Sequence, residues 1–96
     1  MFYHLNGILT DINPGFAVVE CGGVGYYCNI TANSASVIGG KLNEKVKLYI
    51  TEIIREACFD LYGFATFKEK KCFDLLITVS GIGPKAAISI LSANTP

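Results

Sequence analysis

Six consecutive residues, Ser80-Gly81-Ile82-Gly83-Pro84-Lys85, have the side chains and the spacing to bind an anion. The start of a helix leaves backbone N–H groups without partners and carries a partial positive charge, so a phosphate placed there is hydrogen-bonded and electrostatically favoured. Gly81 and Gly83 remove side chains from the approach and permit positive φ, and Pro84 suits the first position of a helix. Lys85 adds a mobile cation. The chemistry that this segment predicts is therefore reversible binding of phosphate.

The wider pattern from Val79 to Ala87 resembles the helix-hairpin-helix motif of many DNA-binding proteins. The resemblance implies that backbone amides of the hairpin bind DNA phosphates across the minor groove without reading the base sequence. The predicted phosphate-binding residues are Ser80, Gly81, Gly83 and Lys85. The alternative is that the two glycines make only a tight turn between two helices, since helices commonly end in glycine.

The rest of the sequence holds no arrangement that points to catalysis. No activated nucleophile, pair of catalytic acids or metal-binding cluster is evident, and the lone His4 is far from a matching set of ligands. We therefore expect a non-catalytic protein with no metal and no cofactor. We also expect the cysteines to be reduced, half-buried and used for packing; they are Cys21, Cys28, Cys58 and Cys72.

Composition and charge set the class of protein. Hydrophobic residues make up 51% of the chain and charged residues 17%, which is typical of a folded domain. Eight basic and eight acidic residues give a formal net charge of zero, whereas nucleic-acid binders are usually basic. Residues 65–96 nevertheless hold more lysines than acids, so the positive part coincides with the phosphate-binding turn. Without a basic leader or a long apolar run, we expect a cytoplasmic protein with no membrane segment.

Five short strands are expected to position this turn. Alternating apolar and polar residues and intervening turn signals define them. The expected strands are Phe2 to Ile12, Phe16 to Cys21, Tyr26 to Ile30, Lys45 to Thr51, and Leu61 to Phe64. Thr31 to Ile38 suits a short helix, and Arg55 to Asp60 is polar enough for a protruding hairpin tip. Five strands with a helix between the third and the fourth match an OB-type barrel.

The period of the pattern changes at Thr66. Thr66 and Glu69 have the spacing of a capping box, in which the hydroxyl and the carboxylate each bind a free backbone N–H group of the other residue. A helix is therefore expected to start there, and a second one at Pro84. The predicted fold class is α+β and mainly β, with an OB-type five-stranded barrel over residues 1–64. Residues 65–96 are expected to begin a truncated helix-hairpin-helix domain.

Taken as a whole, the sequence resembles the N-terminal part of the RuvA family, bacterial proteins that recognise Holliday junctions. Four segments in the same order and spacing carry the resemblance. They are Leu5-Asn6-Gly7; Glu20 with Gly22-Gly23-Val24-Gly25-Tyr26; Arg55-Glu56 with Leu61-Tyr62-Gly63-Phe64; and Gly81-Ile82-Gly83-Pro84-Lys85-Ala86 with Ile90-Leu91-Ser92.

The resemblance implies a non-catalytic, DNA-binding homotetramer that holds four-way junction DNA open for branch migration in recombination and repair. A RuvB-type motor ATPase would be its partner, with a RuvC-type resolvase as a further candidate. Because the second helix-hairpin-helix motif and the domain that docks the motor are not in this sequence, we expect the chain to be a fragment of such a protein.

In that family two adjacent acids at a hairpin tip form a central pin that repels phosphates. The resemblance places Glu56 at the first position of the acidic pin, but Ala57 stands at the second. Asp60 follows three residues later, and the sequence alone leaves open whether it compensates. The alternative for Glu56 is an ordinary solvated turn residue.

Two other functions fit parts of the sequence. The chain could be a helix-hairpin-helix accessory module of a nuclease, ligase or polymerase, which would explain the turn but not the barrel. It could also be a protein-interaction module that uses the barrel surface, with the turn as plain structure. The second reading predicts no binding to four-way junctions at low salt.

Overall fold

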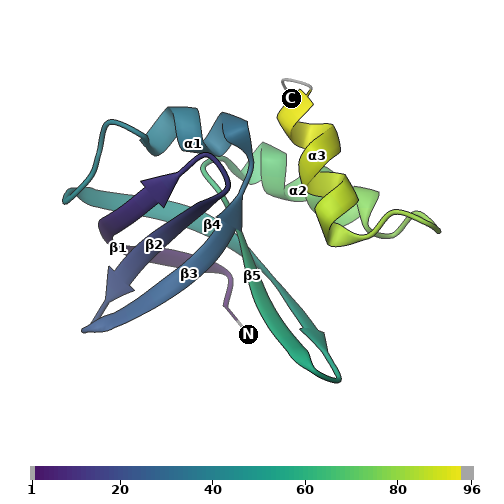
Figure 1. The fold of residues 1–96 in the computed structure, drawn as a ribbon, viewed down its shortest axis with the longest axis horizontal. Coiled ribbons are helices and arrows are strands. Elements are labelled where there is room, and N and C mark those ends of the chain that lie inside the picture. Colours follow the sequence, from purple (N-terminus) through teal and green to yellow (C-terminus); the bar gives the residue numbers. More distant parts are fainter. Residues whose placement is uncertain (1, 94–96) are drawn as a thin grey trace.

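The computed structural model describes residues 2–93, and the strands within them close into a five-stranded barrel with the order β1-β2-β3-β5-β4 (Figure 1). The strands are β1 (His4–Asn13), β2 (Phe16–Cys21), β3 (Val24–Ile30), β4 (Lys45–Arg55) and β5 (Cys58–Phe64). The helices are α1 (Ala32–Ile38), α2 (Phe67–Leu76) and α3 (Pro84–Ala93). The predicted OB-type barrel followed by a helical segment is therefore confirmed.

The barrel closes through one parallel pair. β3 and β5 run parallel and join at Cys28 and Leu61, whereas the other strand pairs are antiparallel. A parallel pair needs a long crossover, and here α1 and β4 provide it. The Thr31 hydroxyl caps α1 by accepting a hydrogen bond from the Ser34 N–H group. The short helix expected over Thr31 to Ile38 is confirmed.

The barrel interior follows from the alternation in the sequence. Val46, Leu48 and Ile50 on β4 are buried, while Lys45 and Lys47 between them are exposed. A strand places successive side chains on opposite faces, so this alternation directs one set into the core. The buried cluster of the barrel consists of Leu5, Leu9, Ala17, Val19, Cys28, Ile30, Ile38, Val46, Leu48, Ile50 and Leu61.

The β4–β5 hairpin is longer and its tip tighter than the sequence predicted. The tip was expected to span Arg55 to Asp60, but the strands pair as far as Arg55 and Cys58, so only Glu56 and Ala57 remain in the turn. The reason is that Ile54 faces Phe59 across the strands, a β-branched and aromatic pair that favours a ladder. The hairpin extends beyond the barrel (Figure 1).

A second apolar cluster joins the helices to the barrel. Phe73 of α2 is fully buried between Tyr62 and Phe64 of β5, with ring centroids 5.1 and 5.0 Å apart. Ala87 and Leu91 of α3 complete the buried part of this cluster. Residues on both sides of the predicted division at residue 64 share this core. The division into two domains stays a prediction, and residues 94–96 of the second predicted domain lie outside the described part.

Glu69 takes a different role from the one that the capping box predicted. The Thr66 hydroxyl does cap α2 by accepting from the Glu69 N–H group at 3.2 Å. The Glu69 carboxylate, however, accepts hydrogen bonds from Ser34 at 2.5 Å and from Thr31 at 2.9 Å. A buried carboxylate needs such donors, and the hydroxyls at the start of α1 supply them. The reciprocal half of the capping box is therefore replaced by a link between α1 and α2.

The cysteines are free thiols, as expected. Cys28 is buried and Cys21 and Cys72 are half-buried, but Cys58 is exposed at the start of β5, so the packing role predicted for it was wrong. Within residues 2–93, no three side chains of the metal-binding types gather closely enough to hold a metal ion. No helix in that range has both the length and the apolar character needed to cross a bilayer.

Replacing Glu69 with alanine is expected to lower the free energy of unfolding by about 2–4 kcal/mol, because it removes charge-assisted hydrogen bonds and leaves buried hydroxyls unsatisfied. Urea unfolding followed by circular dichroism measures this. Glu44→Ala is the control, since Glu44 is exposed and should change stability by less than about 0.5 kcal/mol. Equal stability of the two variants would contradict the link.

Stability at alkaline pH is expected to depend on Cys28. Burial, with a smaller effect of Cys21, raises the pKa of the Cys28 thiol from 9.0 to about 12. Between these values the folded chain keeps a proton that the unfolded chain loses, so folding stability falls as the pH rises through this window. Cys28→Ala should lack this contribution, and its stability gap to the wild-type protein should narrow from pH 9 upward. The exposed Cys58→Ala variant should instead track the wild-type protein in urea titrations.

Candidate nucleic-acid interface

The turn between α2 and α3 is held by its own backbone. After α2 the chain makes short-range hydrogen bonds, including Val79 N to Leu76 O and Ile82 N to Val79 O, both at 3.1 Å. Gly81 has a φ of 87°, in the left-handed region that L side chains disfavour. The Gly83 carbonyl accepts from Ala87 N at 3.0 Å, which makes Gly83 the residue that opens α3. The predicted role of Pro84 as first residue of that helix is confirmed.

The predicted phosphate-binding residues lie together on this turn. Their side chains or backbone are exposed, and they are Ser80, Gly81, Gly83 and Lys85. Ile82 between them is half-buried against the cluster around Phe73. In the part of the chain that the structure describes, the N–H groups of Gly81 and Gly83 have no acceptor. The turn therefore presents free donors to solvent, and phosphate binding by these residues stays a prediction.

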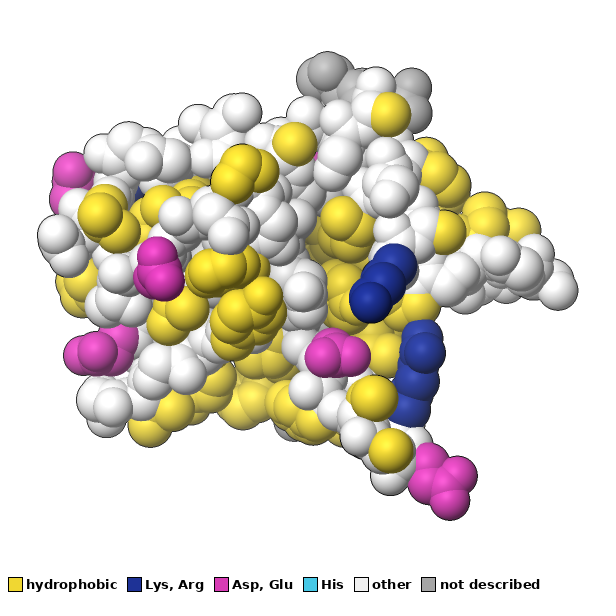
Figure 2. Space-filling view, viewed as in Figure 1, with side chains coloured by type: hydrophobic (Ala, Val, Ile, Leu, Met, Phe, Trp, Pro, Cys, Tyr) yellow, Lys and Arg dark blue, Asp and Glu magenta, His cyan; other side chains and the backbone are white. Residues whose placement is uncertain are grey.

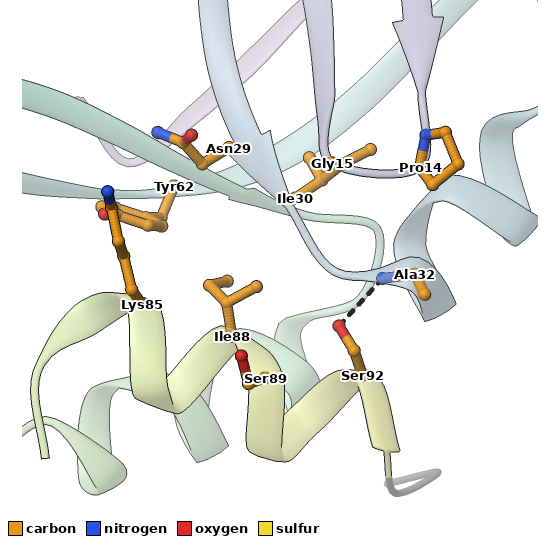
Figure 3. Close-up of a pocket in the computed structure, with 10 residues that line it drawn as sticks. All are labelled: Pro14, Gly15, Asn29, Ile30, Ala32, Tyr62, Lys85, Ile88, Ser89 and Ser92. Carbon is orange, nitrogen blue, oxygen red and sulfur yellow. Dashed lines mark hydrogen bonds between the residues drawn. The ribbon is translucent and has the colours of Figure 1, made fainter.

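Lys85 points somewhere that the sequence did not predict. Its side chain extends from the first turn of α3 back toward Tyr62 on β5 (Figure 3). It lines a groove of about 370 Å³ between α3 and the barrel, whose apolar lining includes Ile88 of α3 and Ile30 of β3. Ser92 closes the far end by accepting from the Ala32 N–H group at 3.1 Å. The cation is thus placed between the turn and the barrel.

The β4–β5 hairpin forms the other side of this region. In Figure 1 the hairpin and the α2–α3 turn project from the barrel on the same side, and the space-filling view of Figure 2 shows a notch between them. Figure 2 shows basic side chains along that notch and an acidic side chain at the end of the hairpin. Glu56 and Ala57 form the exposed tip. The two predicted elements of the site therefore face one notch.

Asp60 is not part of the tip. It pairs with Ile53 across the hairpin and is half-buried, and Ile53 packs against the helical cluster. Burial raises the pKa of Tyr62 from its ordinary value, the Asp60 carboxylate raises it further, and Arg55 opposes this effect. Both charges therefore lie near Tyr62, on the side of the hairpin that faces the helices, and the tip itself carries a single acid.

Tyr62 and Lys70, beside the candidate site, are held by contacts within the protein. Tyr62 is 5% exposed and stacks on Phe73, so it packs in the core that joins the helices to the barrel. Lys70 forms an ion pair with Asp74 at 2.6 Å. The charge of this lysine near the start of α2 is therefore already paired within the protein. No local pattern in the sequence predicts that Arg55 and Tyr62 lie beside the notch, because their positions depend on how β5 meets α3.

A closed OB-type barrel followed by two helices joined through an exposed glycine turn defines the class of protein: an OB-fold protein with a helical extension. Residues 1–63 match the family described as RuvA N terminal domain. The chain belongs to this family.

Curated relatives extend the match beyond the barrel. The chain is 50% identical over all of its 96 residues to the Holliday junction branch migration complex subunit RuvA of Bacteroides thetaiotaomicron, and it covers 47% of that protein. It is 45% identical to the protein of the same name from Acetivibrio thermocellus, again with 47% covered. The identity is 42% over 93 residues for that of Lactococcus lactis, with 46% covered. The chain thus spans about half the length of these relatives, and the similarity includes α2 and α3.

The two glycines of the turn should respond differently to alanine. Gly81→Ala places a side chain at a φ of 87° and is expected to cost about 1–2 kcal/mol of folding stability. Gly83→Ala should stay within about 0.5 kcal/mol of the wild-type protein, because a Cβ there meets no atom within 4 Å. Urea unfolding of both variants measures the difference. Equal losses would contradict the left-handed conformation of Gly81.

Proposed function

We propose that the chain is a non-catalytic DNA-binding part of a RuvA-type subunit that recognises four-way junctions and holds them open for branch migration. The similarity to RuvA subunits over the whole chain carries the proposal. The exposed turn and the hairpin tip on one notch support it, because they are the parts that would meet DNA. Recombination and repair are the processes in which such a subunit acts.

Phosphate binding would rest on the backbone of the α2–α3 turn. The free N–H groups of Gly81 and Gly83 and the first turn of α3 can donate to a phosphate oxygen, with Ser80 beside them and Lys85 supplying charge. Such contacts read no base sequence. They also suit a chain with no net charge, because they use backbone dipoles instead of a basic surface.

The Glu56 tip would act by repulsion. A carboxylate repels DNA phosphates, most strongly where little water lies between them. DNA strands that would cross the position of Glu56 are therefore disfavoured, and the strands separate around the hairpin. One turn binds DNA weakly by itself, and one acid repels it weakly. A homotetramer would bring four of each to one junction and raise affinity through effective concentration.

The remaining assignments follow from the same proposal. The partners are four-way junction DNA, a RuvB-type motor ATPase that acts through parts of the full-length protein, and a RuvC-type resolvase. ATP hydrolysis belongs to the motor, and this chain needs neither a metal nor a cofactor. Residues 65–96 begin the helix-hairpin-helix domain, residues 1–64 are the barrel domain, and the location is the cytoplasm.

The chain is expected to bind a synthetic four-way junction more tightly than a linear duplex of the same arm sequence, with affinity that falls as salt rises. Gly83→Val should weaken junction binding by about tenfold, because the side chain blocks the approach of phosphate at a position where an added Cβ meets no atom of the protein within 4 Å. Gel shifts measure the affinities, and sedimentation measures the oligomeric mass in parallel.

Circular dichroism and urea unfolding serve as controls for the fold of Gly83→Val. A folded variant that binds the junction normally would overturn the assignment of the turn to phosphate. Equal affinity of the wild-type chain for junction and duplex would contradict junction recognition and favour a general helix-hairpin-helix accessory module. No binding to either DNA at low salt would favour a protein-interaction module.

A further inference from the structure

Asp60 is a half-buried acid beside an apolar cluster. It lies on β5 opposite Ile53, and Ile53 packs against the cluster that joins the helices to the barrel. Successive side chains of a strand point to opposite faces, so Asp60 shares the face of Tyr62 and not that of Phe59 or Leu61. This face of the hairpin, the flank of the notch, is the one that looks toward α3.

The charge of Asp60 is not neutralised within the chain. Among residues 2–93 its carboxylate takes part in no ion pair and accepts no hydrogen bond. Arg55 lies near enough to oppose its effect on Tyr62 but does not form an ion pair with it. Bringing a second negative charge close to a half-buried carboxylate that has no partner raises the electrostatic energy.

A cation, Lys85, lies on α3 across from this flank. Lys85 and Tyr62 line the groove between α3 and the barrel, and the Lys85 side chain reaches toward β5 (Figure 3). A DNA backbone held at Lys85 and continuing across the notch would therefore run toward Asp60. The notch thus has the Lys85 cation on its α3 side, while its hairpin side carries one cation, Arg55, and the unpaired acid Asp60.

We propose that Asp60 is a specificity-determining residue that disfavours uninterrupted duplex in the notch and so replaces, from the flank of the hairpin, the acid that Ala57 does not provide at the tip. A continuous duplex on Lys85 carries its backbone past this flank, whereas the strands of a four-way junction part at the hairpin and turn away. The inference rests on the proposed function and goes beyond it by assigning discrimination to a residue outside the tip.

The test measures binding of the full chain to a fluorescein-labelled linear duplex and to a synthetic four-way junction by fluorescence anisotropy at low salt. Asp60→Asn keeps the size of the side chain and removes its charge. It should tighten duplex binding by about two- to fivefold and change junction binding by less than about twofold. Glu44→Gln, the same charge change just before the opposite end of β4, should leave both affinities unaltered.

A second comparison separates direct repulsion from an effect through Arg55. If Asp60 acts on phosphate itself, Asp60→Asn should tighten duplex binding equally when introduced into Arg55→Gln. If Asp60 only holds Arg55 away from DNA, the gain should vanish in that background, and the proposal is overturned. The gain should also shrink at high salt, because screening weakens repulsion between exposed charges.

The outcomes distinguish this inference from the function on which it rests. A wild-type chain that prefers the junction, together with an Asp60→Asn variant of unchanged preference, rejects the role of Asp60 and leaves junction recognition standing. A wild-type chain without any preference rejects the proposed function and this inference with it. Urea unfolding of each variant confirms that affinities are compared between folded proteins.

Discussion

The packing of Phe73 against Tyr62 and Phe64 is the contact on which the remainder of the arrangement depends. It fixes α2 on β5, and β5 is also one arm of the hairpin that carries Glu56. Thr51 adds a second attachment, since its hydroxyl donates to Asp74 of α2 at 2.6 Å. The distance between the hairpin tip and the glycine turn is therefore set by a packed aromatic core and not by a flexible linker.

Local patterns in the sequence predicted the barrel and the helices well. Alternation along β4, the turn signals between strands and the cap at Thr66 each depend on residues a few positions apart. The role of Glu69 could not be predicted in this way, because its partner Ser34 lies 35 residues earlier. The hairpin tip was placed too broadly because polar residues were taken as turn, while the cross-strand pair of Ile54 and Phe59 extends the ladder.

The sequence predicted the turn and the hairpin of the candidate site as structural elements but not their geometry, and the binding roles of their residues stay predictions. Glycine spacing indicated the turn, and the left-handed φ of Gly81 agrees with it. The direction of Lys85 and the flank position of Asp60 arise from where β5 and α3 meet, which no local pattern encodes. The balanced charge of the chain is also easier to understand in three dimensions, because basic side chains gather along the notch while an acidic side chain stands at the end of the hairpin.

The length of β4 has a consequence for how this kind of protein can diversify. Its eleven residues span roughly 36 Å at about 3.3 Å each; the first five pair with β1 in the barrel wall, and the last leads into the two-residue tip. Residues at the tip touch no core, so they can be exchanged without disturbing the fold that aims them. A single substitution at the tip can therefore change its charge while the hairpin keeps its position.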